Sequence, residues 1–190
     1  MRPHPSPSPE LEIEIKLKLN RIEDIRPKIV ALGFTVAVPY SFESNTVFDT
    51  PDRTLKNRGS LLRLRTMNGN HTLTFKCPPP EEIPDAVGYK IKKEINVGIA
   101  DSENFQAILT ALGFEPFFIY EKYREILKRE ADSLIVTLDH TPVGDYLEIE
   151  GQTDPIDRLA GQLGFGKPDY ITDTYYTLFV KQGKTGDMTF

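Results

Sequence analysis

Charged and apolar residues alternate without a break from residue 10 to residue 19. Glu or Lys stands at every even position of Glu10–Leu19, and Leu or Ile stands at every odd position. Successive side chains of a strand point to opposite faces of a sheet, so this period of two predicts a β-strand with one charged face and one apolar face. A strand with its charges in water and a strand that lines a charged cavity both have this pattern.

Seven later segments are also predicted as strands. Most of them are short runs rich in apolar and β-branched residues, and the hairpin signal Asn68-Gly69-Asn70 joins two of them. They comprise residues 45–49, 60–66, 72–76, 89–97, 120–128, 134–139 and 146–150.

Three amphipathic helices are predicted between the strands, because apolar residues recur there at spacings of three and four. The first follows Asn20, which we expect to cap it, although Pro27 should delay its start to about Asp24 or kink it. The other two open at Asp101 and Asp154. Each run ends in Leu-Gly-Phe, where glycine is typical of a helix C-terminus. We therefore expect a repeated strand-then-helix unit that covers one large sheet.

The charged side chains of the predicted strands gather on one face. Arg63 and Arg65, for example, lie opposite Leu62 and Leu64. Only the strand at 120–128 is mixed, with acids on both sides of its basic residues. A solvated face explains any single strand, but an open sheet would then expose a very large field of mixed charge. We therefore predict an α+β fold in which the sheet closes into a barrel, with a charged interior and the helices packed outside.

The charges of this interior form a basic set and an acidic set. Buried charges are costly unless they neutralise one another or receive a charged ligand. The basic set suits a chain of phosphoryl groups, and the crowded acids suit a hard divalent cation, Mg²⁺ or Mn²⁺. The basic set is Lys16, Lys18, Arg63, Arg65, Lys76, Lys90, Lys92, Lys122 and Arg124; the acidic set is Glu12, Glu14, Asp139, Glu148 and Glu150.

Bulk properties narrow the class of protein. A chain of 190 residues fits one main domain, expected over residues 10–182 between a flexible Pro/Ser leader (1–9) and a C-terminal tail (183–190). A net charge of −5 argues against nucleic acid as a partner, and no apolar run has the length of a membrane span. The single cysteine, Cys77, rules out an internal disulfide. We expect a cytoplasmic protein, and a homodimer stays open.

The order of these charged residues resembles the CYTH domain, the triphosphate tunnel metalloenzyme superfamily. Its Glu-x-Glu-x-Lys signature is similar to Glu12, Glu14 and Lys16, and the match runs in order over nearly the whole chain. One departure is that Lys92, Glu94 and Asn96 stand where many members carry Arg-x-Glu-x-Glu. The further matches are Arg63 with Arg65, Lys76, Lys122 with Arg124, Asp139, and Glu148 with Glu150.

The resemblance implies an eight-stranded antiparallel tunnel that binds a small-molecule triphosphate. It implies that the five acids hold one or two divalent ions and that the basic set binds the phosphates. Seven of the basic residues would also stabilise charge during the reaction. These seven are Lys16, Arg63, Arg65, Lys76, Lys92, Lys122 and Arg124.

Three functions remain open from the sequence. The first is hydrolysis of a phosphoanhydride bond in inorganic tripolyphosphate, thiamine triphosphate or a nucleoside triphosphate. The second is a class IV adenylate cyclase, in which the ribose 3′-hydroxyl replaces water and pyrophosphate leaves. The third is a polyphosphate-binding module without catalysis, which the intact acidic set disfavours.

Overall fold

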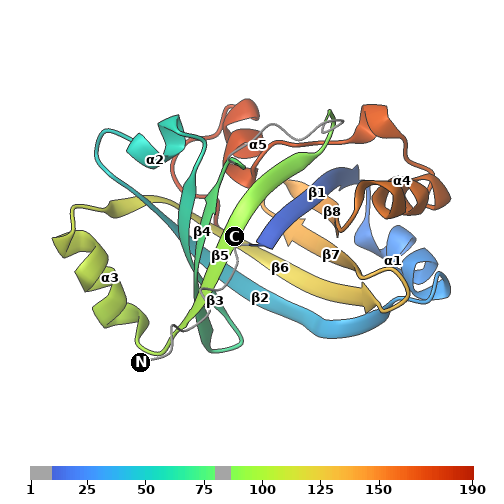
Figure 1. Ribbon diagram of the computed structural model, residues 1–190, viewed down its shortest axis with the longest axis horizontal. Coiled ribbons are helices and arrows are strands. Elements are labelled where there is room, and N and C mark those ends of the chain that lie inside the picture. Colours follow the sequence, from blue (N-terminus) through green and yellow to red (C-terminus); the bar gives the residue numbers. More distant parts are fainter. Residues whose placement is uncertain (1–9, 80–86) are drawn as a thin grey trace, which may run out of the picture.

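Eight antiparallel strands close into a barrel (Figure 1). The computed structural model describes residues 10–79 and 87–190, so the predicted leader lies outside the described residues. Neighbours around the barrel follow the order β1-β5-β4-β3-β2-β6-β7-β8. The predicted fold class is therefore confirmed. The strands are β1 (Glu10–Leu19), β2 (Thr35–Asp49), β3 (Leu61–Met67), β4 (Asn70–Cys77), β5 (Lys90–Ile99), β6 (Glu115–Arg129), β7 (Leu134–Thr141) and β8 (Gly144–Glu150).

The first strand completes the ring by pairing on both edges. On β1, Glu14 lies opposite Lys90 of β5 and opposite Glu150 of β8. Because side chains alternate, this register sends the even positions of β1 inward from Glu12 onward and the odd positions outward. Ile15 and Leu17 are accordingly fully buried in the core outside the barrel wall.

Helices cover the outer, apolar face of the barrel, as predicted. The helices α1 (Ile22–Ala31) and α4 (Thr153–Gln162) pack on the apolar side chains of β1, β7 and β8. At the other end of the molecule, α3 (Ser102–Ala111) packs on β3 and β4 (Figure 1). Each contact removes apolar surface from water, which is the main source of stability for such an arrangement.

All three repeats of Leu-Gly-Phe end a helix, as the sequence predicted. Gly33, Gly113 and Gly164 have φ values of 88°, 89° and 91°, a left-handed conformation that favours glycine. The amide of the following phenylalanine turns back to a helix carbonyl, at 3.0 Å between Phe114 N and Leu109 O. This turn sends the chain back toward the sheet.

Several predicted boundaries are wrong. Arg21, not Asn20, stands at the N-cap of α1, without a side-chain cap, and the helix runs from Ile22 through Pro27. Strand β2 begins ten residues earlier than predicted, at Thr35 instead of residue 45. Three short helices were not predicted. These are α2 (Thr54–Asn57), η1 (Lys167–Asp169) and α5 (Tyr175–Lys181).

The segment set apart as a tail, residues 183–190, packs against the barrel. Met188 is fully buried, and its amide donates to Ile119 O of β6 at 2.9 Å. The boundary at residue 182 stays a prediction. None of the helices in the described part of the chain has the length and apolarity that crossing a membrane requires.

Candidate functional site

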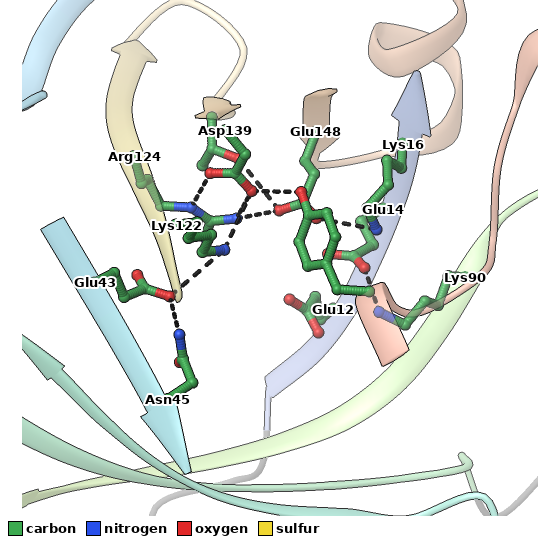
Figure 2. Close-up of polar contacts among 12 residues, drawn as sticks. Glu12, Glu14, Lys16, Glu43, Asn45, Lys90, Lys122, Arg124, Asp139 and Glu148 are labelled. Atoms are coloured by element: carbon green, nitrogen blue, oxygen red, sulfur yellow. Dashed lines mark hydrogen bonds and ion pairs between the residues drawn. The ribbon is translucent and has the colours of Figure 1, made fainter. Parts of the chain in front are cut away.

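The barrel encloses a cavity of about 780 Å³, lined by most of the residues predicted for the site. Residues from all eight strands line it, because each strand turns alternate side chains inward. Figure 2 shows acids and bases from separate strands pointing toward one another in this space. The predicted residues that line the cavity are Glu12, Glu14, Lys16, Arg63, Arg65, Lys76, Lys90, Lys92, Lys122, Arg124, Glu148 and Glu150.

Lys18 does not line the cavity. It is exposed near the end of β1, where its ammonium donates to Val143 O at 3.3 Å and lies 4.9 Å from the ring centroid of Tyr146. The alternation of side chains predicted on which face of β1 Lys18 lies, but it could not show that this position is beyond the end of the cavity. Its predicted contact with phosphate has no support from this position.

Asp139 is fully buried and is not among the residues that line the cavity. Arg124 donates to both of its oxygens, Nε to Oδ1 at 2.6 Å and NH2 to Oδ2 at 2.5 Å. Oδ2 also accepts from Lys122 Nζ at 3.1 Å and from the hydroxyl of Tyr175 at 2.6 Å. Asp139 therefore orients two cations whose side chains line the cavity (Figure 2). Its predicted role as a metal ligand stays a prediction.

On the wall formed by β1, β4 and β5, acids and bases pair across strands. Lys90 Nζ lies 2.5 Å from Glu14 Oε1. Lys76 Nζ lies 2.5 Å from both Glu12 and Glu94. Glu12 and Glu94 therefore share the positive charge of one ammonium.

The pKa shifts of these acids follow from burial and from the charges around each carboxylate. Burial and then the charge of Glu14 raise the pKa of Glu12 to about 8. Burial and Glu14 also raise the pKa of Glu150. Burial alone would raise the pKa of Glu14 too, but the ammonium of Lys90 keeps it below its ordinary value. Burial alone would also raise the pKa of Glu94, but the charge of Lys76 lowers it to about 2. Glu12 and Glu150 thus lack sufficient positive charge nearby. On the same two strands, the charges of Lys90 and Lys16 hold the pKa values of Glu14 and Glu148 below the ordinary value, against the effect of burial.

These acids fit a divalent cation by their chemistry. Glu12, Glu14 and Glu150 offer hard oxygen ligands from adjacent strands, and Glu14 lies directly opposite Glu150. In residues 10–79 and 87–190, no three acids, histidines or cysteines are already arranged as a ligand set. Glu12 and Glu14 are instead held by Lys76 and Lys90. A cation entering here would take over the charge compensation that these lysines now supply.

The wall formed by β3 offers positive charge to the cavity. Arg63 is buried, and its guanidinium donates to the hydroxyl of Tyr120 at 3.0 Å and to Thr74 Oγ1 at 3.3 Å. Within the described residues its Nε has no hydrogen-bond partner. Burial and the charge of Arg63 lower the pKa of Arg65, whose nearest carboxylate, Glu43, is 3.9 Å away. Two arginines with spare donors suit the oxygens of an anion.

Two buried residues of this site were not predicted from the sequence. Glu43 of β2 is fully buried, 3.5 Å from Lys122 Nζ, and accepts from Asn45 Nδ2 at 3.0 Å (Figure 2). Its carboxylate and Asp139 hold Lys122 from two sides. The signal was the period-two pair of polar residues at 43 and 45, but the predicted strand began only at 45.

The departure at Lys92, Glu94 and Asn96 also has a structural counterpart. Lys92 is partly exposed and donates to Gly59 O at 2.9 Å, while burial and then the charge of Lys90 lower its pKa. Asn96 donates to Glu94 at 2.6 Å and accepts from Thr74 at 2.7 Å. The amide thus extends the network that holds Glu94.

The decisive comparison is with known protein families. A sequence model of the CYTH domain matches residues 10–175 of this chain, which is most of its length. The chain belongs to the CYTH domain family. Enzymes of this family are adenylate cyclases or triphosphatases, and its triphosphate tunnel proteins depend on metal ions.

Two relatives of this CYTH protein carry the name of adenylate cyclase. A candidate adenylate cyclase of Methanocaldococcus jannaschii is 31% identical over 127 residues, which cover 67% of this chain and 69% of the relative. The adenylate cyclase CyaB of Aeromonas hydrophila is 26% identical over 171 residues, which cover 84% of each chain.

Solved structures share the fold of the CYTH protein. A candidate adenylate cyclase of Vibrio parahaemolyticus superimposes with a TM-score of 0.76 at 21% identity, over 90% of this chain and 99% of the other. A Hippeastrum protein, a candidate adenylyl cyclase described as having a dominant triphosphatase activity, gives a TM-score of 0.59 at 21% identity. That match covers 92% of this chain and 97% of the other.

Proposed function

We propose that this CYTH protein hydrolyses a phosphoanhydride bond of a triphosphate compound, with Mg²⁺ or Mn²⁺ as cofactor. The observation that carries the proposal is the division of one enclosed cavity into two walls. Arg63 and Arg65, which have spare donors, lie on one wall, and the acids Glu12, Glu14 and Glu150 lie together on adjacent strands of the other. A metal-loaded triphosphate is a ligand that satisfies both walls at once.

The acids of β1 and β8 would hold the cation. Glu12, Glu14 and Glu150 are the leading ligands because they face the cavity from adjacent strands. Glu148 also lines the cavity but is paired with Lys16 and Arg124, and Asp139 is a candidate by family resemblance alone. A bound divalent ion supplies charge neutralisation and Lewis acidity.

The basic residues would bind and orient the phosphate chain. Arg63 and Arg65 can each grip two phosphate oxygens. Lys122 and Arg124 are held in place by Asp139, so they offer fixed charges where negative charge develops on the transferred and leaving groups. This arrangement favours the transition state because the charges need little reorganisation.

A class IV adenylate cyclase is the second candidate. The Aeromonas hydrophila relative, which matches 84% of this chain, is an adenylate cyclase by name. The dominant triphosphatase activity described for the Hippeastrum protein, which has the same fold, supports hydrolysis as the first candidate. The two reactions use the same phosphate site and differ in the nucleophile.

The test offers purified protein ATP, thiamine triphosphate and inorganic tripolyphosphate with Mg²⁺ or Mn²⁺. Chromatography separates phosphate, pyrophosphate and cyclic AMP. Orthophosphate without cyclic AMP supports the hydrolase, accompanied by an equal amount of pyrophosphate when the substrate is tripolyphosphate. Cyclic AMP as the main product from ATP overturns the hydrolase in favour of the cyclase. Binding without turnover would leave a binding module.

Variants of the two walls test the residue assignments. We expect Arg65→Ala, Glu14→Ala and Glu150→Ala each to abolish turnover while the protein stays folded by circular dichroism. Arg158→Ala, an exposed arginine of α4, is the matched control and should retain the wild-type rate. A wild-type rate in any wall variant would show that its assignment is wrong.

A further inference from the structure

The cavity has an aromatic part that a chain of phosphates does not need. Beside the charged walls, its lining includes Val47, Leu61, Phe117, Phe118 and Tyr176. Phosphate oxygens gain nothing from apolar and aromatic walls. A volume of about 780 Å³ also lies in the range of roughly 300–1,000 Å³ typical of sites for organic ligands.

Two of these aromatic rings are only partly buried. Phe117 and Tyr176 lie with their ring centroids 5.0 Å apart at an interplanar angle of 54°. Phe118 is buried beside them, in an edge contact with Tyr176 at 5.0 Å. The buried ring of Phe118 therefore packs against the partly buried pair and supports it.

In the structure, basic side chains approach these ring faces. Lys56 Nζ lies 5.1 Å from the ring centroid of Phe117 and 4.7 Å from that of Tyr176. The guanidinium carbon of Arg53 lies 4.7 Å from the ring of Phe117. Contacts of this kind are weak when the cation is exposed, as Lys56 is. A heteroaromatic ring that stacks on the same face gains more, because it buries a larger area.

The short helix that carries Lys56 is fixed to the barrel. Asp49 is buried, and its carboxylate accepts from the amides of Leu55 and Lys56, each at 2.9 Å. The backbone is thus held, while the exposed lysine side chain ends in one long hydrogen bond, from its Nζ to the hydroxyl of Tyr176 at 3.3 Å. The aromatic rings would therefore be accessible to a ligand without rearrangement of the fold.

The aromatic part adjoins the arginine wall. Phe118 stacks on Tyr120 with centroids 5.8 Å apart, and Tyr120 accepts from Arg63. A triphosphate bound at Arg63 would therefore have its organic end beside Phe117 and Tyr176. Elsewhere in the lining, Ile126 and Ile135 offer no ring for stacking, and Tyr89 is buried with its hydroxyl donating to Asp157 at 2.6 Å.

We infer that Phe117 and Tyr176 form a subsite for the planar heteroaromatic group of an organic triphosphate, such as a nucleoside triphosphate. The inference rests on the proposed function and narrows its substrate class, because inorganic tripolyphosphate has no group for this subsite. Phe117 and Tyr176 determine specificity and take no part in the chemistry.

The test compares ATP with inorganic tripolyphosphate on the full chain. In Phe117→Leu, which keeps an apolar side chain but removes the ring, we expect KM for ATP to rise about tenfold, or about 1.4 kcal/mol. KM for tripolyphosphate should stay within about twofold, since no phosphate contact changes. Phe117→Tyr, which keeps the ring, should stay close to wild type for both substrates. Tyr176→Leu provides a second variant with the same expected pattern, and thermal melting identifies any variant that fails to fold.

Equal changes in KM for both substrates, or an unchanged KM for ATP, would overturn the subsite. Calorimetric titration of the same two compounds in the presence of Mg²⁺ separates this outcome from failure of the proposed function. If neither compound is hydrolysed, but the wild type binds ATP more tightly than tripolyphosphate and Phe117→Leu removes that difference, the subsite is supported and the proposed hydrolase is ruled out. If tripolyphosphate is hydrolysed and the protein shows no preference for ATP that depends on the ring of Phe117, the proposed hydrolase is supported and the subsite is ruled out.

Discussion

Replacing Glu43 by glutamine removes one buried charge from the barrel and keeps the shape of the side chain. The carboxylate lies 3.5 Å from Lys122 and 3.9 Å from Arg65. Burial alone would raise its pKa, but the charges of Lys122 and Arg124 lower it from the ordinary value of 4.5 to about 2. The folded protein therefore favours the ionised form of Glu43.

The size of this shift sets the expected loss of stability. One pKa unit corresponds to about 1.4 kcal/mol of stability. The shift in the pKa of Glu43 from 4.5 to about 2 therefore contributes about 3 kcal/mol to the free energy of unfolding at neutral pH. The pKa is lower in the folded state, so this stability is present above pH 4.5 and is lost as the pH falls toward 2. By the same relation, roughly 1 kcal/mol remains at pH 3.

Urea unfolding of the wild type and Glu43→Gln at a series of pH values measures the effect. We expect the difference in unfolding free energy to fall from about 3 kcal/mol at pH 7 to about 1 kcal/mol at pH 3. The difference between the two unfolding free energies at each pH cancels the contribution from titration of the other acids, which both proteins share. Glu130→Gln, at an exposed position, is the control and should differ little from wild type. A difference that stays constant between pH 7 and pH 3 would refute the assigned charge contacts.

Three further predictions concern packing and ligand binding. Tyr175→Phe removes the hydroxyl that donates to Asp139 at 2.6 Å, so the unfolding free energy should fall by about 2 kcal/mol; no loss would mean that this bond does not form in solution. Gly151→Ala should cost about 1–3 kcal/mol, because Gly151 has a φ of 156° and a Cβ there would lie 2.5 Å from Leu134 Cδ2. Gly161→Ala, in open space on α4, should instead stabilise by about 0.5–1 kcal/mol, and equal effects at the two glycines would contradict the strain argument. Tripolyphosphate with Mg²⁺ at about 100 times its Kd should add about 2.7 kcal/mol and raise Tm by roughly 5–10 °C, whereas no rise at saturation would count against binding in the cavity.

The inward charges were predictable because strand alternation is a local rule. Glu12, Glu14 and Lys16 could be assigned to one face from their spacing alone. Their partners could not, because each ion pair depends on how distant strands align. Lys76, for example, meets both Glu12 and Glu94 because β5 lies between β4 and β1.

Glu43 was missed because the first half of β2 departs from regular alternation. Pro39 interrupts this half, and the register with β6 shifts between Val36 and Val38 and again between Val38 and Ser41. Such bulges move side chains out of the period-two pattern. A sequence rule that requires strict alternation therefore loses the strand before it reaches Glu43.

The mixed charges of β6 have their explanation in a helix. Glu125 faces outward, where Arg26 of α1 donates to it at 2.7 Å and 2.9 Å. An acid on the outer face is thus paired with a helix and does not belong to the cavity. The sequence could not show this partner, because it depends on where α1 packs.

The position of β1 has a consequence for the time at which the protein becomes complete. This strand pairs with β5 and β8, which the ribosome makes much later than β1 itself. Until residues 144–150 have been synthesised, the nascent chain cannot close the ring and keeps an unpaired strand edge. Pairing between distant segments is also slow. We therefore expect the chain to depend on protection from aggregation until translation has passed β8.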